Sequence, residues 1–292
     1  MPELPGRLEQ LKGFLQLLFT NKMAVAGVSI FAVFSIMAIF APFLHTVDQK
    51  ATGEVGSILL PPSGQFWLGT DDLGRDIWSQ IVYGSRVSFT IGFVAAGITV
   101  LFGTLIGLIA GFYGGRLEEV LMRIVDFFMM LPELPLMIVL AAILGPSIWN
   151  IVLVVIIVSW PTTARVIRSQ VLSVKERAFV EASRCIGAGD SLLMVGEILP
   201  NVIPLMFAEA VLMVTEAIYA ESVLAFLGLG DPTTVSWGMM LHFVFESGVM
   251  ARVPNWVMPP VASICALILA FTFLGTAISD VMKPGYRETR GL

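Results

Sequence analysis

Six long apolar runs divide this chain, and shorter polar or glycine-rich segments separate them. An α-helix needs about 20 mainly apolar residues to cross a bilayer. The runs that reach or approach this length are residues 23–44, 87–113, 120–144, 147–163, 202–229 and 257–281. We therefore expect an all-α integral membrane protein with six transmembrane helices.

The composition favours the same fold class. Hydrophobic residues make up 57% of the chain and charged residues 13%, whereas a soluble domain is about 45–50% apolar and about 25% charged. The first apolar run is longer than the roughly 7–15 residues of a signal peptide core, so we expect a retained span. The 17 Lys and Arg residues are scattered in short groups, which excludes a basic nucleic-acid-binding face.

The distribution of positive charge gives the orientation, because cytoplasmic segments of membrane proteins are enriched in Lys and Arg. With a cytoplasmic N-terminus, the inner segments and inner span ends hold 13 of these residues and the outer segments hold 4. Six spans place both termini in the cytoplasm. The polar segment 165–200 then lies on the cytoplasmic side, between spans four and five. Cys185 and Cys265 are separated by this topology, so we expect neither a disulfide nor a metal site.

The chain divides into three parts. Residues 1–86 contain a leader, the first span and an external segment, residues 87–285 contain five spans and the cytoplasmic loop, and residues 286–292 form a cytoplasmic tail. Leucines at helical spacing in the leader indicate either an amphipathic helix on the inner leaflet or a frayed terminus.

Two external segments are too long for simple turns. In the first we expect irregular structure, followed by a short interfacial helix at Asp76–Tyr83, with aromatic side chains near the lipid headgroups. The second, residues 228–254, is expected to be re-entrant or interfacial.

Glycines and prolines predict how two spans pack and bend. Gly103, Gly107 and Gly111 recur every four residues and form a stripe suited to close approach of another helix. The third span contains Pro132 and Pro135, which each remove a helical hydrogen bond, so we expect a bend there. On the same span, Asp126 is expected to pair with Arg123.

Four glutamates lie within the apolar runs, where an ionisable group costs about 2.5–3.5 kcal/mol or more without a polar environment. They are Glu133, Glu209, Glu216 and Glu221. At about 100° per residue, Glu209 and Glu216 share one face of their helix, and Glu221 points elsewhere. These residues are candidates for a translocation path. Helix packing and pairing with a partner subunit remain open alternatives.

The cytoplasmic segment 165–200 predicts two helices with a break between them. Helix-forming residues end at Gly187 or Gly189, either of which can adopt the left-handed conformation of a helix end. Asp190 can cap the next helix, which continues towards Leu199-Pro200. We interpret the first helix, with Glu181 near its centre, as an exposed knob that fits a groove on another protein.

This loop resembles the EAA loop of ABC importer permeases. The residues that carry the resemblance are Glu181, Ala182, Ser183, Gly187, Leu199 and Pro200. The resemblance implies a coupling helix that sits in a cleft of an ATPase. Two positions depart from the usual pattern. Ser183 stands where alanine is commoner, and Glu197 stands where an aliphatic residue is commoner and lies outside the helical knob.

Further motifs resemble the dipeptide/oligopeptide/nickel permease subfamily, and within it the second, C-type subunit. They include Leu68–Asp71, Leu73–Asp76, Tyr83–Arg86, Ala220–Ser222 and Ser236–Gly238. The resemblance implies the ABC type I importer permease (MetI-like) fold. It also implies a heterodimer with a second permease subunit, two ABC ATPase subunits and an extracytoplasmic solute-binding protein. The external residues expected to contact the binding protein are Asp71, Arg75, Asp76, Arg86 and Trp237.

These observations lead to a hypothesis of function. The chain is expected to be one permease of an ATP-driven importer in the cell membrane, working by alternating access. It contains no P-loop motif, so ATP and Mg are expected on the partner ATPases, with no cofactor on this chain and no enzymatic activity of its own. Peptide is the expected substrate, with nickel and oligosaccharides as alternatives.

Two alternative functions fit the sequence less well. A proton-coupled carrier would use the four glutamates as a relay, but it would leave the cytoplasmic motif unexplained. An intramembrane protease is disfavoured because His45 and His242 are the only histidines and no HExxH motif occurs.

Overall fold

The structure, a computed structural model, describes residues 21–44 and 58–282. The expected leader, the first part of the external segment and the C-terminal tail lie outside these residues. Within them every regular element is helical, and the β structure is limited to one bridge between Thr70 and Asp76. The expected all-α fold is confirmed.

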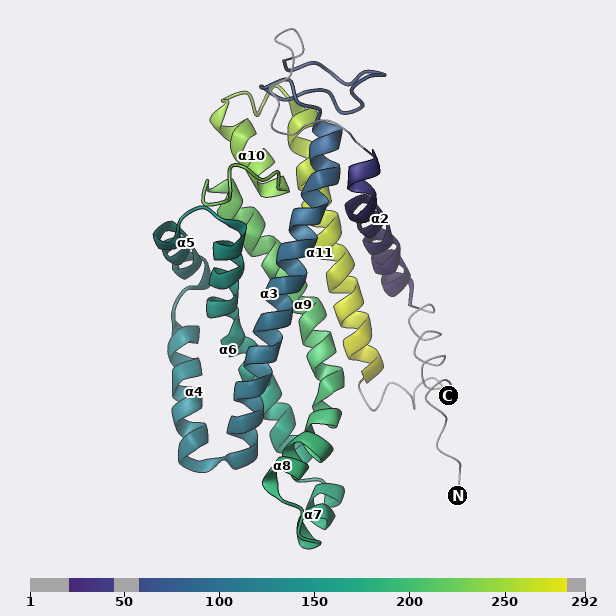
Figure 1. Ribbon diagram of the computed structural model, residues 1–292. Coiled ribbons are helices and arrows are strands. Elements are labelled where there is room, and N and C mark those ends of the chain that lie inside the picture. The colour runs from purple at the N-terminus through teal and green to yellow at the C-terminus, as the bar shows by residue number, and fades with distance from the viewer. Residues whose placement is uncertain (1–20, 45–57, 283–292) are drawn as a thin grey trace.

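The helices form one elongated bundle (Figure 1). The long ones are α2 (Lys22–Leu44), α3 (Ile77–Tyr113), α4 (Gly115–Met130), α5 (Glu133–Leu144), α6 (Ile148–Lys175), α9 (Leu199–Phe226) and α11 (Pro254–Met282). The short ones are α7 (Ala178–Cys185), α8 (Asp190–Leu192), the π-helix η2 (Leu193–Ile198) and α10 (Trp237–Glu246). In Figure 1, α7 and α8 lie at one end of the bundle and α10 lies near the other.

Five helices of the described part are long and apolar enough to cross a membrane, and a bent pair, α4 with α5, brings the number to six. The pair turns by 88° at a short break. Leu131 is extended there, and Pro132, which precedes the first residue of α5, cannot continue the hydrogen-bond ladder of α4. The expected bend is confirmed, and it is sharp enough to divide the span into two helices.

Helix α3 packs most closely against α6, along the glycine stripe. A Cβ atom at Gly103 would lie 2.7 Å from Cβ of Thr163, and one at Gly107 would lie 2.5 Å from the carbonyl oxygen of Ala164. Only a residue without a side chain allows the two backbones to come this near. The structure confirms the close approach that the stripe predicts and gives α6 as the partner.

Two predictions of helix limits were wrong. The segment Asp76–Tyr83 is not a separate interfacial helix, because Asp76 caps α3, and α3 runs unbroken from Ile77. The Asp76 side chain accepts hydrogen bonds from the backbone N–H groups of Trp78 and Ser79. Helix α6 continues past Pro161 to Lys175, twelve residues beyond the expected end at 163.

The expected pair of Asp126 with Arg123 was also wrong. Asp126 pairs with Arg165 of α6, and Arg123 pairs with Glu119, 2.9 Å away on its own helix. The tertiary pair replaces the local one because α6 lies alongside α4. It therefore ties the two helices together.

Candidate functional site

Helix α7 forms the knob of the loop between α6 and α9. It ends at Cys185, and Gly187, two residues further on, has a φ of +90° in the left-handed region. The N–H of Gly187 donates to the carbonyl of Arg184, and the N–H of Ala188 donates to that of Ser183. This is the double hydrogen bond of a Schellman motif. The glycine therefore both ends the helix and satisfies its free carbonyls.

The motif residues lie where a partner can reach them. Glu181, Ala182 and Gly187 are exposed, and the neighbouring Ile186 is 88% exposed. Leu199 and Pro200 form the first turn of α9. The two parts of the motif thus belong to a projecting helix and to the start of a membrane helix.

Apolar packing and one hydrogen bond hold α7 against η2, which leads directly into α9. Val180 is 1% exposed and lies in a cluster with Leu193, Ile198 and Val202. Ser183 Oγ donates to Glu197 Oε1 at 3.2 Å. Ser183 and Glu197 are the two departures from the expected pattern, and they contact one another. Glu197 was expected to lie outside the knob. Its side chain accepts a hydrogen bond from Ser183, which belongs to the knob.

Three polar contacts connect the same end of α6 to its neighbours. Lys175 Nζ donates to the carbonyl of Phe112 near the end of α3 and lies over the Phe112 ring. Arg168 Nε donates to Glu118 Oε1 of α4 at 2.7 Å. With the Asp126–Arg165 pair, these contacts hold α3, α4 and α6 as a unit.

A cavity of about 340 Å³ opens beside this unit. Its lining residues are Leu172, Lys175, Glu176, Glu181 and Arg184. They come from the end of α6, the link that follows it and α7. Residues of both charges border the cavity, which suits a polar contact from a partner protein.

The structure brings together three of the four candidate path residues. Glu133 and Glu209 lie near enough to Glu216 to interact with it electrostatically. Glu133 and Glu216 are exposed and Glu209 is half-buried. The three carboxylates come from α5 and α9, so the bend that begins α5 also places Glu133 opposite α9.

Glu221 is separate from this group. It is 1% exposed, and the hydroxyl groups of Ser222 and Ser236 interact with its carboxyl group. Ser236 is the N-cap of α10. Glu221 therefore lies at the junction of α9 with α10, near a helix N-terminus, where negative charge is favoured. Its position supports packing over path lining, which were both left open by the sequence.

The loop before α3 is built around Asp71, which is 0% exposed. Its carboxylate accepts hydrogen bonds from the backbone N–H of Leu73 and Arg75, from Arg75 Nε at 2.7 Å and from Gln80 Nε2 at 2.8 Å. Beside it, burial raises the pKa of the Asp72 carboxyl, the charge of Asp71 raises it further, and Arg75 opposes the shift.

Trp237, the first residue of α10, packs against the first turns of α3. The indole is 0% exposed and lies over Gly84, where a Cβ atom would be 2.6 Å from the ring. Its Nε1 donates to the carbonyl of Ile81 at 3.0 Å. Two motifs more than 150 residues apart in the chain therefore pack directly on each other.

The expected contact residues for a binding protein thus fall into two groups. Asp71, Asp76 and Trp237 are buried, so they shape the surface at this end of the bundle without forming it. The Arg75 side chain is 15% exposed, and Arg86 is exposed. The burial of the Asp71, Asp76 and Trp237 side chains could not be deduced from the sequence motifs. The same residues could equally make a packing contact inside the protein or a contact with a partner.

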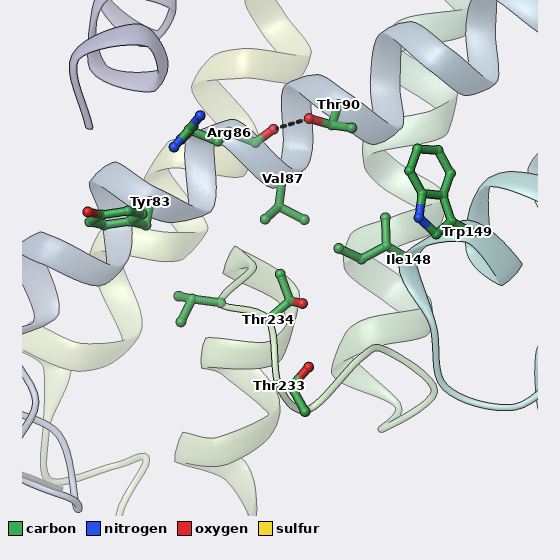
Figure 2. A pocket seen from close by; sticks show the side chains of 9 residues that line it. Tyr83, Arg86, Val87, Thr90, Ile148, Trp149, Thr233 and Thr234 are labelled. Carbon is green, nitrogen blue, oxygen red and sulfur yellow. Dashed lines mark hydrogen bonds between the residues drawn. The ribbon is translucent and has the colours of Figure 1, made fainter. Parts of the chain in front are cut away.

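A cavity of about 360 Å³ lies next to Arg86 (Figure 2). It is lined by Tyr83, Arg86, Val87, Thr90, Ile148, Trp149, Thr233, Thr234 and Val235. In Figure 2 the Arg86 head group points away from Thr233 and Thr234. The sequence interpretation missed the two threonines and Trp149. The Asp231-Pro232 turn was the available signal, and Asp231 holds Thr233 through its backbone N–H and its hydroxyl.

A bundle of five or six helices apolar enough to cross a membrane, with an exposed helix projecting at one end and carboxylates within the apolar helices, is typical of a multi-pass membrane permease. Residues 103–288 match the family described as "Binding-protein-dependent transport system inner membrane component". Residues 9–62 match the "N-terminal TM domain of oligopeptide transport permease C". The chain belongs to this family of peptide ABC transporter permeases.

Curated relatives match most of the chain. It is 37% identical over 266 residues to the dipeptide transport system permease protein DppC of Alkalihalophilus pseudofirmus, covering 90% of this chain and 86% of the relative. It is 36% identical over 270 residues to the oligopeptide transport system permease protein OppC of Bacillus subtilis, covering 92% and 88%. It is 34% identical over 269 residues to the probable D,D-dipeptide transport system permease protein DdpC of Escherichia coli, covering 90% and 88%. These relatives are transport subunits, and the family belongs to ABC importers, which implies ATPase and binding-protein partners.

Proposed function

We propose that this chain is a permease subunit of an ATP-driven importer that moves di- or oligopeptides across the cytoplasmic membrane. The family and the names of the relatives, which specify dipeptides, oligopeptides and D,D-dipeptides, support this substrate class. Both termini lie in the cytoplasm in this proposal, in agreement with the distribution of positive charge.

The partners follow from the expected division of labour. A second permease subunit forms the other half of the pathway, an extracytoplasmic binding protein delivers the peptide, and two ATPase subunits bind ATP and Mg. The surface around Arg86 receives the binding protein, and Asp71, Asp76 and Trp237 hold that surface in shape. Closure of the ATPases moves the two coupling helices, and the pathway changes the side to which it opens.

One observation carries the proposal: α7 is an exposed helix that projects at the end of the bundle and is anchored to the first turns of a membrane helix (Figure 1). A helix held in this way can transmit a displacement to α9. Helix α9 carries Glu209 and Glu216, so the displacement reaches the carboxylates that are candidates for the path.

The test replaces Glu181 with alanine. In proteoliposomes that contain the complete transporter, Glu181→Ala is expected to reduce ATP-dependent peptide uptake to background while the permease remains in the membrane. Glu119→Ala is the matched control. It removes an exposed carboxylate of α4 whose ion pair is 62–77% exposed and is worth about 0–1 kcal/mol, so uptake should persist. Uptake that survives ATP depletion but collapses with the proton gradient would instead favour a carrier that uses the three clustered glutamates.

A further inference from the structure

We infer that Ser183 and Glu197 are positioning residues whose hydrogen bond fixes the orientation of the coupling helix α7 relative to α9. The inference rests on the proposed function, because it concerns how movement of α7 reaches the membrane. Neither residue is expected to touch the peptide or the nucleotide.

The bond is a directional contact between the two elements. Ser183 Oγ and Glu197 Oε1 lie 3.2 Å apart, and both side chains are half-buried. The apolar contact between α7 and η2 centres on Val180. Apolar burial is non-directional, whereas a hydrogen bond weakens steeply as its angle departs from linear. Burial therefore keeps α7 near η2, and the hydrogen bond selects one angle.

The chain between the two residues does not fix that angle. It contains Gly187, in the left-handed conformation, and Gly189, and a Cβ atom at either position would meet no other atom within 4 Å. Gly187 and Ala188 are hydrogen-bonded to the end of α7, and Ala188 packs partly against the apolar cluster. This leaves Gly189, whose backbone is not restricted by a side chain, as the point about which α7 can rotate. The hydrogen bond between Ser183 and Glu197 joins α7 to η2 directly, without relying on this connection.

Glu197 is also bonded to the membrane helix. Its backbone carbonyl accepts a hydrogen bond from Asn201 Nδ2 of α9 at 2.8 Å. Glu197 therefore links Ser183, through its side chain, to Asn201, through its main chain. Among the residues that the structure describes, no ion pair includes Glu197. The serine is thus the polar side-chain partner that the structure provides for this carboxylate.

The test measures peptide imported per ATP hydrolysed by the complete transporter in proteoliposomes, with an isotopically labelled mixture of di- to pentapeptides. Ser183→Ala and Glu197→Ala are each expected to lower this ratio about fivefold, the factor that one net hydrogen bond contributes to a two-state equilibrium. The double variant should lose no more than either single variant, because both changes remove the same bond.

Conservative variants separate positioning from general destabilisation. Ser183→Thr keeps the donor and Glu197→Gln keeps an acceptor oxygen, so both should retain a ratio near that of the unmodified protein. Ser191→Ala removes an exposed hydroxyl from the same loop and should leave the ratio unchanged. If neither alanine variant assembles, Glu197→Asp, which shortens the acceptor by one methylene group, should lower the ratio in its place.

Two results would overturn the inference, and they are distinguishable. If the unmodified transporter imports peptide with ATP and the variants keep its ratio, or if their effects add, Ser183 and Glu197 do not position α7. If the unmodified transporter shows no ATP-driven uptake, the proposed function fails and the inference fails with it.

Discussion

At the scale of single residues, the loop between α6 and α9 depends on Gly187. Its positive φ allows the N–H groups of Gly187 and Ala188 to close the end of α7. The space around it is open, so a substitution would be strained by the backbone conformation and not by a clash. The position is therefore sensitive to backbone geometry alone.

Replacement of Gly187 by alanine should cost about 1–2 kcal/mol in the left-handed conformation. We expect a lower melting temperature of the purified permease and reduced ATP-dependent uptake, with Gly187→Asn retaining more of both because Asn tolerates this conformation. Gly189→Ala is the matched control, since Gly189 has an ordinary φ of −72° and equally open surroundings. Equal losses in the two alanine variants would contradict this account.

The sequence limited the end of the knob to Gly187 or Gly189, and the resemblance to the EAA loop pointed to Gly187, because both are local features with a characteristic spacing. It did not predict the bond between Ser183 and Glu197, because the bond depends on how α7 folds back onto η2. The buried states of Asp71 and Trp237 were missed for the same reason. Each is determined by packing with a distant segment, and no local pattern reports such packing.

At the scale of elements, hydropathy predicted the spans well and their ends poorly. Helix α3 begins ten residues before the expected start because Asp76 caps it while the first turns are still amphipathic. Helix α6 extends past its apolar run because its polar final turns pair with α4 and α3. A hydropathy pattern detects the length of contact with lipid, whereas a cap or an ion pair determines where a helix ends.

The close contact of α3 with α6 gives a prediction at this scale. A Cβ atom at Gly107 would lie 2.5 Å from a backbone oxygen, and backbone cannot move aside as a flexible side chain can. Gly107→Ala is therefore expected to destabilise the permease by about 1–3 kcal/mol, as overpacking does. Thermal unfolding in detergent would measure the loss.

Gly97→Ala on the same helix is the control. A Cβ atom there would meet no other atom within 4 Å, and alanine favours the helix more than glycine does. Its melting temperature should stay the same or rise. A comparable fall in both variants would show that the stripe is not the cause.

At the scale of the whole molecule, the chain has a carboxylate cluster between two functional ends. One end is a hydrogen-bonded cap around Asp71 and Trp237, and the other end is the exposed helix α7. Glu133, Glu209 and Glu216 lie in the apolar part that separates them. This order predicts that movement at α7 changes the surroundings of the cluster.

Cysteine accessibility would test that expectation. In a variant with Cys185 and Cys265 replaced by serine, Glu216→Cys should react with a charged thiol reagent, and a non-hydrolysable ATP analogue should change the rate in the complete transporter. Phe207→Cys is the control, because Phe207 is 66% exposed and lies about 180° from Glu216 on α9. It should face lipid and react slowly with or without nucleotide. A rate at Glu216→Cys that does not respond to nucleotide would contradict alternating access at this position.

The π-helix η2 has a consequence for how the two ends are aligned. It joins directly onto α9, so its residue count sets the rotational phase of every side chain that follows. Each α-helical residue turns by about 100°. A residue of a π-helix turns by somewhat less than this. One residue more or fewer between Leu193 and Ile198 would therefore rotate Glu209 and Glu216 by roughly a quarter of a circle relative to α7. The direction in which the two carboxylates point around the α9 axis therefore depends on the number of residues in η2, and not on the identity of those residues.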